Sequence, residues 1–331
     1  MIRIGILGAA KIAPKAVINP AKNREDCEVV AIASRELSKA QAYADEHDIP
    51  TAIEGYDALV AREDIDLIYN ALPPNRHLDL SVAALKTGKS ILCEKPFTMN
   101  AREAEMMVEA AETSKGYLIE GFHYRYHPAC LKFLSIIQSE KIGELIDIQG
   151  TFNVSIPNRS GELRYIPELG GGALMDLGCY VLHIMRITTG LEPVVLSAAS
   201  KMARSGVDVR MTADMKFGDI SASLTCDMEQ GTERIITFIV KGKKGHIIFD
   251  QFVHPCRPPG FSIKIETEHG TQVFMLDNDK TLYTKSTYDY QLSHMIDVMS
   301  GKTKPLTGGH DAIKTMKAID SIYAASGHPK N

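Results

Sequence analysis

A strand that ends in a glycine turn and runs into a helix opens this sequence, and it restricts the fold more than any other feature. Ile2–Leu7 is short and rich in β-branched residues, and Gly8 follows it directly. Further apolar runs and helical patterns then alternate as far as residue 122. Strands that alternate with helices indicate a parallel sheet with helices on both faces. The sequence therefore predicts an α/β fold that begins with a doubly wound parallel sheet.

The pattern changes after residue 122. A strand is expected over residues 142–154, and three glycines at 170–172 open a long apolar segment over 173–189. Strand-like runs separated by turn signals then occupy much of residues 194–276, and helical patterns close the chain. Such runs favour a large, mostly antiparallel open sheet. We therefore expect one domain over residues 1–122 and an α+β domain over residues 123–331, whose C-terminal helix is able to pack back on the first domain.

Charge and apolar patterning exclude several classes of protein. The 331 residues carry 37 basic and 41 acidic side chains, so the net charge is −4. This balance provides no general basic field for nucleic acid or anionic lipid. No uncharged apolar run approaches the roughly 18 residues that a membrane span needs. We expect neither a nucleic-acid partner nor a membrane partner.

Cysteine and histidine spacing gives no sign of a disulfide framework or a metal site. The six cysteines form no C-x-x-C pair, which favours free thiols in a reducing compartment. His123 and His127 are four residues apart, a spacing compatible with zinc, but Pro128 follows and no H-E-x-x-H motif exists. The expectation is a cytoplasmic protein without a metal.

The turn after the first strand is a candidate phosphate cradle. In the fingerprint G-x-G-x-x-G, the three glycine places are taken here by Gly8, Ala10 and Ala13. Gly8 can make the tight turn, and Ala10 still permits a close approach of the backbone to a pyrophosphate at the helix N-terminus. A tight turn of any α/β protein is the alternative. The candidate cofactor contacts are Gly8, Ala9, Ala10, Lys11 and Ile12.

The end of the second expected strand indicates which dinucleotide would bind. A domain specific for NAD usually places an acidic residue here, on the ribose 2′-hydroxyl. This chain has Ser34 and Arg35, with Lys39 one turn further on. A guanidinium and a hydroxyl suit a 2′-phosphate. The alternative is a solvated Arg35, with Glu36 facing the ribose. We expect NADP, with NAD the less favoured cofactor.

Two further segments carry side chains suited to proton transfer. Lys95 lies between Glu94 and Pro96 at the end of an expected strand, where open α/β sheets bind ligands. A lysine there can exchange a proton with a carbinol, although a surface lysine before a turn proline is the alternative. Asp176 and Tyr180 are four residues apart, which places both on one face of a helix, with His183 near the same face. A capped core helix is the alternative for that segment.

The motifs, taken in order, resemble those of the Gfo/Idh/MocA oxidoreductases. They are GILGAAKIA, ASR, NALPPNRH, CEKPF, GFHYRYHP and LGGGALMDLGCY. The resemblance covers nearly the whole chain. It is nearest to the branch that holds glucose-fructose oxidoreductase, dimeric dihydrodiol dehydrogenase and NADP-dependent D-xylose dehydrogenase.

The resemblance implies roles for particular residues. Lys95 matches the main catalytic lysine, Asp176 matches the family aspartate, and Tyr180 replaces a histidine found in inositol-type members, so Tyr180 would share the proton transfer. It also implies a cis peptide before Pro96. Beyond the turn and second-strand residues, the expected cofactor contacts are Leu72, Pro73, Asn75, His77, Glu94, Lys95 and Arg164, with Pro74 in the same segment. The expected substrate contacts are His123, Arg125 and Tyr180.

The sequence thus predicts an NADP(H)-dependent oxidoreductase that transfers hydride between nicotinamide and the carbinol or carbonyl carbon of a sugar or cyclic diol. Two alternatives remain: a reductase of nucleotide-linked ketosugars, and a non-catalytic NADP-binding regulator. Retention of Lys95, Asp176 and Tyr180 argues against the regulator.

A homodimer or higher homo-oligomer is also expected. One face of the second sheet lacks covering helices, and the run RIITFIV at residues 234–240 suits burial on both faces.

Overall fold

The computed structural model describes residues 1–275 and 285–328, so the end of the strand-like run expected up to Leu276 lies outside the described residues. The chain forms two compact units. Met1–Phe122 and Tyr288–Ile313 make up the first, and His123–Thr287 with the chain from Lys314 onward makes up the second. The segment that rejoins the first unit is fixed there by Thr307, whose hydroxyl donates to the carbonyl oxygen of Glu120 at 2.6 Å.

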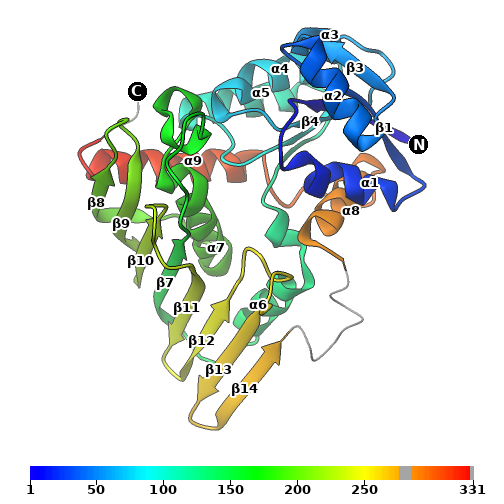
Figure 1. Ribbon diagram of the computed structural model, residues 1–331. Coiled ribbons are helices and arrows are strands. Elements are labelled where there is room, and N and C mark those ends of the chain that lie inside the picture. The colour runs from blue at the N-terminus through cyan, green and yellow to red at the C-terminus, as the bar shows by residue number, and fades with distance from the viewer. Residues whose placement is uncertain (276–284, 329–331) are drawn as a thin grey trace. The chain divides into compact units, whose positions relative to one another are not determined.

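The first unit contains a six-stranded sheet in which every neighbouring pair is parallel. The strand order is β3-β2-β1-β4-β5-β6, and Figure 1 shows this unit in blue and cyan with α8 in orange. The order reverses between β1 and β4, and open α/β sheets bind ligands at such a switch point, beyond the carboxyl ends of the strands. The predicted doubly wound sheet is confirmed. The strands are β1 (Ile2–Leu7), β2 (Cys27–Ser34), β3 (Thr51–Glu54), β4 (Leu67–Asn70), β5 (Ser90–Cys93) and β6 (Leu118–Glu120). The helices are η1 (Pro14–Ile18), α1 (Asn19–Lys22), α2 (Leu37–His47), α3 (Tyr56–Val60), η2 (Pro74–Arg76), α4 (His77–Lys86), α5 (Ala101–Glu112) and α8 (Thr287–Met299).

The second unit contains an eight-stranded sheet of order β14-β13-β12-β11-β7-β10-β9-β8. All its neighbouring pairs are antiparallel except β7 with β10. The predicted mostly antiparallel sheet is therefore confirmed as well. Its strands are β7 (Leu145–Asn153), β8 (Val194–Met202), β9 (Asp208–Phe217), β10 (Ile220–Asp227), β11 (Ile235–Gly242), β12 (Gly245–Asp250), β13 (Ser262–Thr267) and β14 (Gly270–Met275). Its helices are η3 (His123–Tyr126), α6 (Pro128–Gln138), η4 (Leu163–Tyr165), η5 (Pro167–Leu169), η6 (Leu174–Gly178), α7 (Cys179–Thr189) and α9 (His310–Ala325), which begins in the first unit.

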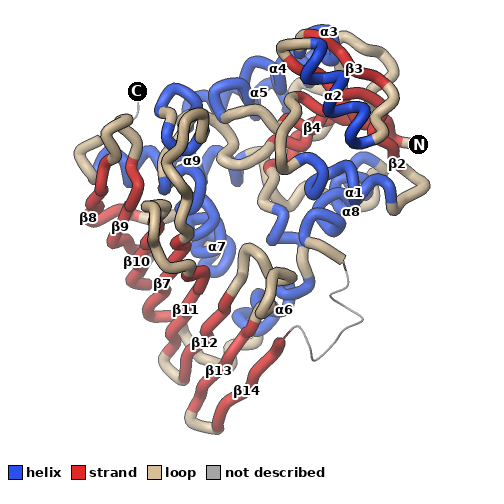
Figure 2. Tube along the Cα trace, in the orientation of Figure 1, coloured by secondary structure: helices blue, strands red, loops and turns tan. Residues whose placement is uncertain are grey.

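Helices α6 and α7 lie against one face of this sheet (Figure 2). The close approach of α7 depends on Gly150 of β7, because a Cβ atom there would overlap the side chain of Val181. Along β11, Phe238 and Val240 are fully buried, whereas Thr237 and Ile239 are partly exposed. We expected the second face of this strand to be buried against a partner subunit, and that expectation stays a prediction. The strand alternates, because only one of its faces meets helices.

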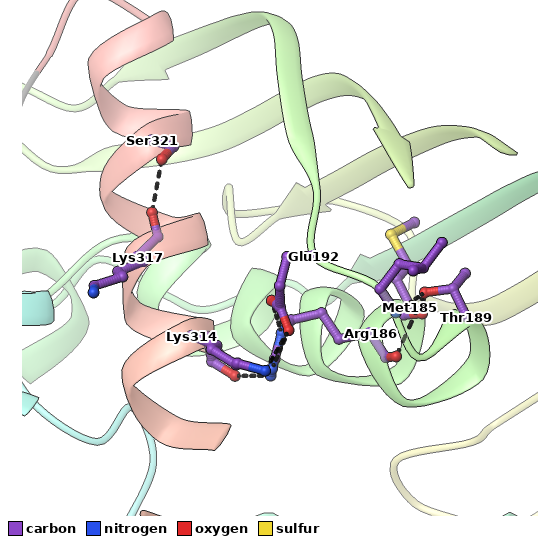
Figure 3. Close-up of polar contacts among 9 residues, drawn as sticks. Met185, Arg186, Thr189, Glu192, Lys314, Lys317 and Ser321 are labelled. Carbon is purple, nitrogen blue, oxygen red and sulfur yellow. Dashed lines mark hydrogen bonds and ion pairs between the residues drawn. The ribbon is translucent and has the colours of Figure 1, made fainter. Parts of the chain in front are cut away.

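A buried arginine fastens α7 to the turn that follows it and to α9 (Figure 3). The Arg186 guanidinium donates from Nε and Nη2 to the two carboxylate oxygens of Glu192, at 2.7 and 3.0 Å, and from Nη1 to the Thr315 hydroxyl at 2.7 Å. The Arg186 side chain is only 4% exposed. Lys314 approaches the same carboxylate at 3.5 Å from a more exposed position.

We expect Arg186→Met to lower the free energy of unfolding by about 1–3 kcal/mol, because it removes charge-assisted hydrogen bonds that join two helices. Lys314→Met is the matched control, since its longer, exposed contact should contribute less than about 0.5 kcal/mol. Urea denaturation of both variants measures the difference. Equal midpoints for the two variants would contradict this account of the buried arginine.

Within residues 1–275 and 285–328, no helix combines the length and the apolar character that a membrane crossing requires. The same residues include no cluster of three or more His, Cys, Asp or Glu side chains arranged to hold a metal ion. All six cysteines are free thiols, and Cys256 alone among them is exposed.

Candidate active site

The turn after β1 has the backbone geometry of a phosphate cradle. Gly8 has a φ of +92°, and a Cβ atom there would lie 2.8 Å from Leu72 Cδ2. Its N–H donates to the Ala33 carbonyl at 2.9 Å, which ties the turn to β2. The Ala10 N–H closes the turn onto the Gly8 carbonyl at 2.8 Å, and the Tyr43 hydroxyl donates to the Ala10 carbonyl at 2.9 Å.

The residues between this turn and η1 face solvent in part. Ala9 and Lys11 are exposed, and Ala10 and Ile12 are partly exposed. The helix that follows begins as a π-helix at Pro14, a form that is rare and frequent at functional sites. The backbone therefore leaves room for a ligand beyond the carboxyl end of β1.

The end of β2 presents a guanidinium without a protein partner. Ser34 is 7% exposed and ends the strand, whereas Arg35 is exposed and makes no hydrogen bond or ion pair with the described part of the chain. Lys39 instead lies 2.6 Å from the Glu36 carboxylate, and this contact lowers the pKa of Glu36. Lys39, which we expected to contact the cofactor, is thus paired with Glu36. Arg35 is the residue whose charge is left to bind an anion.

His77 holds two loops together at the carboxyl edge of the first sheet. Its Nε2 lies 2.7 Å from the Leu72 carbonyl, and its Nδ1 lies 3.1 Å from the Phe97 carbonyl. The ring is fully buried, and burial lowers its pKa in spite of these carbonyls. We expected His77 to contact the cofactor. Its nitrogens instead face backbone, so it acts by fixing the loops after β4 and β5, where Pro73 and Asn75 lie in or beside η2.

Lys95 follows β5 directly, and the peptide between Lys95 and Pro96 is cis, as expected. Its neighbour Glu94 accepts a hydrogen bond from the Tyr69 hydroxyl at 2.6 Å, and Tyr69 is fully buried on β4. Burial and then the Glu94 carboxylate raise the pKa of Tyr288 on α8, which places Tyr288 near this carboxylate too. Glu94, an expected cofactor contact, is thus held by a buried phenol, and Lys95 is partly exposed beside it.

In the second unit, Tyr180 lies in a buried polar group. Its hydroxyl is 3.2 Å from His123 Nε2, and His123 Nδ1 is 2.8 Å from the Thr287 hydroxyl. Tyr180 is 5% exposed and His123 is 1% exposed. We expected His123 to contact the substrate, but both of its ring nitrogens lie against protein hydroxyls. His183, expected near the same helix face, is fully buried with Nδ1 at 2.7 Å from the Tyr124 hydroxyl.

The helix that carries Asp176 and Tyr180 changes its type between these two residues. The segment begins as a π-helix, Leu174–Gly178, and becomes α-helical at Cys179. The π turn at the start was not expected from the sequence, and the expectation that both side chains lie on one face of the helix stays a prediction. The start of the π-helix is fixed by Asp208, which is 1% exposed and accepts from the Leu174 N–H at 2.8 Å and from the Tyr323 hydroxyl at 2.7 Å.

Arg164 belongs to the second unit and pairs with the candidate catalytic aspartate. Its Nε donates to Asp176 Oδ2 at 2.6 Å, and its Nη1 donates to Glu162 at 2.9 Å. The Asp176 side chain is 17% exposed and that of Arg164 is 44% exposed. We expected Arg164 to contact the cofactor; its guanidinium pairs with these two carboxylates and stays partly exposed, so the cofactor contact remains a prediction.

Arg125, an expected substrate contact, keeps part of its hydrogen-bonding capacity. Its Nε and Nη1 atoms are buried and have no hydrogen-bond partner within the described residues.

Of the residues near Tyr180 and Asp176, the sequence analysis missed Thr287, Glu162 and Asp208. Thr287 is 164 positions from His123 in the chain, so no local pattern links them.

Two family models match the chain. Residues 2–122 match the oxidoreductase family with an NAD-binding Rossmann fold, and residues 131–248 match the GFO/IDH/MocA C-terminal domain.

Curated relatives and solved structures match over most of their length. The chain is 29% identical to D-xylose 1-dehydrogenase (NADP(+)) 2 of Haloferax volcanii, over 97% of this chain and 96% of that protein. It is 31% identical to trans-1,2-dihydrobenzene-1,2-diol dehydrogenase of Xenopus tropicalis, over 76% of this chain and 82% of the relative. A 3-ketoreductase from Actinomadura kijaniata, solved with NADP and TDP-benzene, is 26% identical and superimposes with a TM-score of 0.87, over 98% and 97% of the two chains.

These relatives fall in the dehydrogenase branches that the motifs indicated. With both of its folded units matched, the chain belongs to the GFO/IDH/MocA family of oxidoreductases.

Proposed function

We propose that this protein transfers hydride between NADP(H) and the carbinol or carbonyl carbon of a neutral sugar or cyclic diol. One observation carries the proposal: the first sheet brings the Gly8 turn, Arg35 and Lys95 to the same carboxyl edge. A dinucleotide lying along that edge would meet Arg35 at one end and Lys95 at the other. The xylose and dihydrodiol relatives support this substrate class.

The residues present suit NADP. Gly8 makes the tight turn at a φ of +92° with exposed Ala9 and Lys11 beside it, and Arg35 offers an exposed guanidinium that has no partner among the described residues to a 2′-phosphate. Ser34 ends β2 beside it. When bound, NADP supplies the nicotinamide carbon that accepts or gives the hydride.

The chain's own contribution is positioning and proton transfer. We assign Lys95 and Tyr180 to the proton of the reacting hydroxyl, because a carbinol loses a proton as well as a hydride when it is oxidised. Asp176, oriented by Arg164 at 2.6 Å, would accept from a substrate hydroxyl. Arg125 remains a candidate substrate contact, and contact through its buried Nε and Nη1 atoms would require the side chain to move.

A nucleotide-linked ketosugar is a second candidate substrate. The likeness to the 3-ketoreductase solved with TDP-benzene favours it. The neutral sugar or diol is preferred, because the xylose relative is 29% identical over 97% of this chain, whereas the 3-reductase of Actinomadura kijaniata is 26% identical over the same share.

A substrate panel tests the proposal. Purified protein is mixed with NADP⁺ or NAD⁺ and with pentoses, hexoses and trans-cyclic diols, and in the reverse direction with NADPH and a dTDP-linked ketosugar. We expect reduction of NADP⁺ by at least one neutral sugar or diol. Turnover of the nucleotide-linked sugar alone would replace the first candidate by the second. Cofactor binding without any turnover would favour a regulator.

We also propose a cytoplasmic homodimer. Free thiols suit a reducing compartment. In β7 and β11, Gln149, Thr237 and Ile239 are partly exposed and alternate with the buried residues of these strands. Homodimer interfaces are more apolar than the rest of the surface, and Ile239 is the apolar side chain among these three. Sedimentation at micromolar concentration should give about twice the 36.4 kDa of the chain; a single species of monomer mass would reject the dimer.

A further inference from the structure

We propose that His123 is a positioning residue for Tyr180: its Nε2 accepts the hydrogen of the Tyr180 hydroxyl, while its Nδ1 donates to the Thr287 hydroxyl. The inference rests on the proposed role of Tyr180 in proton transfer. It replaces the substrate contact that the sequence led us to expect for His123.

The geometry of the three side chains forms one line of polar contacts. The Tyr180 hydroxyl lies 3.2 Å from His123 Nε2, and the Thr287 hydroxyl lies 2.8 Å from His123 Nδ1. All three residues are buried, at 5%, 1% and 6% exposure for Tyr180, His123 and Thr287. Buried polar atoms at these distances are hydrogen-bonded partners rather than accidental neighbours.

The plane of the His123 ring is also fixed. The His254 ring stacks on it with centroids 5.8 Å apart and an interplanar angle of 20°. The Tyr180 ring meets it edge-on, at 5.8 Å and 65°. Stacking covers one face of the imidazole and restricts rotation of the ring. The two ring nitrogens therefore stay directed at the two hydroxyls. The Phe152 ring, 5.7 Å from that of Tyr180, restricts the phenol in turn.

The donor and acceptor roles follow from the chemistry of the groups. A neutral imidazole has one N–H and one accepting nitrogen. If Nδ1 donates to the Thr287 hydroxyl oxygen, Nε2 is left as an acceptor, and the Tyr180 O–H donates to it. The lone pairs of the Tyr180 oxygen are then directed away from His123. A hydroxyl held in this way presents a lone pair of fixed orientation to the substrate hydroxyl, which donates a hydrogen bond to it, and the proton released on oxidation passes to the neutral amine of Lys95.

A matched pair of substitutions separates this role from simple packing. In His123→Gln, the side-chain amide oxygen reaches about as far as Nε2 and still accepts from Tyr180. In His123→Asn, the shorter amide reaches about as far as Nδ1, so it keeps a partner for Thr287 but does not reach Tyr180. Both replacements are polar and similar in volume, so a purely structural role predicts no advantage for glutamine.

We expect His123→Asn to lower kcat by about 5–10-fold, the effect of one hydrogen bond, with KM nearly unchanged. We expect His123→Gln to stay within about threefold of the parent protein, because it keeps that bond. In a Tyr180→Phe background, where the hydroxyl is absent, His123→Asn should cause no further loss. Such non-additivity identifies two residues that act through one interaction.

The outcomes distinguish the failure of this inference from the failure of the proposed function. The assay uses the full-length protein, NADP⁺ and the substrate found in the panel, with NADP⁺ binding of each variant as the measure of folding. If Tyr180→Phe leaves kcat unchanged, the role of Tyr180 falls and this inference falls with it. If Tyr180→Phe lowers kcat but the His123→Asn loss persists in that background, or glutamine is as poor as asparagine, the inference alone is overturned.

Discussion

Replacing Lys95 by methionine should abolish nearly all turnover. The lysine follows β5 directly, and the loops beside it are fixed by buried groups, His77 on one side and the Tyr69–Glu94 contact at 2.6 Å on the other. Methionine has a similar length and removes only the charged, proton-exchanging group. General acid–base groups contribute about 10²–10⁴-fold to turnover, and we expect a loss in this range.

Single-turnover reduction of NADP⁺ and titration with NADP⁺ measure the two parts of this prediction separately. The affinity for NADP⁺ should change by less than about threefold, because the Gly8 turn and Arg35 remain. Lys86→Met, on the exposed side of α4 in the same unit, is the matched control and should retain parental turnover. A loss smaller than about tenfold would remove Lys95 from the proton transfer.

Arg35→Ala should weaken NADP⁺ binding about 10- to 100-fold and leave NAD⁺ binding nearly unchanged. A charge-assisted hydrogen bond contributes about 1.5–3 kcal/mol, and about 1.4 kcal/mol is tenfold in affinity. The 2′-phosphate that would receive this bond is absent from NAD⁺. Lys39→Ala should have a smaller effect, because Lys39 is already paired with Glu36 at 2.6 Å.

Calorimetric titration of both cofactors into each variant checks this selectivity. Arg102→Ala, an exposed arginine on α5, controls for the loss of general positive charge. Equal weakening of NADP⁺ and NAD⁺ binding by Arg35→Ala would show that the guanidinium acts on a part common to both cofactors. The assignment of the 2′-phosphate to Arg35 would then be wrong.

The sequence predicts the first sheet well because its strands are short apolar runs between helices. The apolar run at residues 29–33 lies within the observed strand Cys27–Ser34, and the run at residues 67–70 is a strand over its whole length. The strand Thr51–Glu54 was missed, because an edge strand that is mostly half-exposed lacks a continuous apolar run. In the second sheet, the strand expected over residues 142–154 is shorter, Leu145–Asn153.

The candidate site is predicted less completely, because its side chains are arranged by tertiary contacts. Spacing alone places Asp176 and Tyr180 on one α-helical face, yet the helix begins as a π-helix fixed by Asp208. Motif position alone assigns Arg164 to the cofactor, whereas its guanidinium pairs with Asp176. These arrangements depend on partners that are distant in the chain, and periodicity carries no information about them.

Two histidines illustrate the same limit. A polar residue in a ligand-binding motif reads as a contact to the ligand, but His77 and His123 are both buried and face protein atoms. Each of them positions other groups. His77 holds the loops beside Lys95, and His123 orients the hydroxyl of Tyr180. Residues of this kind tune a site without touching the reacting atoms.

Hydride transfer from a carbinol to the cofactor is the central claim, and isotope transfer tests it most directly. The substrate found in the panel is deuterated at the reacting carbon and incubated with the protein and NADP⁺, and the isolated reduced cofactor is examined by mass spectrometry and proton NMR. The account predicts one deuterium at nicotinamide C4 for each substrate oxidised, and labelling about 10²–10⁴-fold slower when Lys95→Met replaces the parent protein. Reduced cofactor that carries no deuterium, or substrate consumption without reduced cofactor, would contradict it.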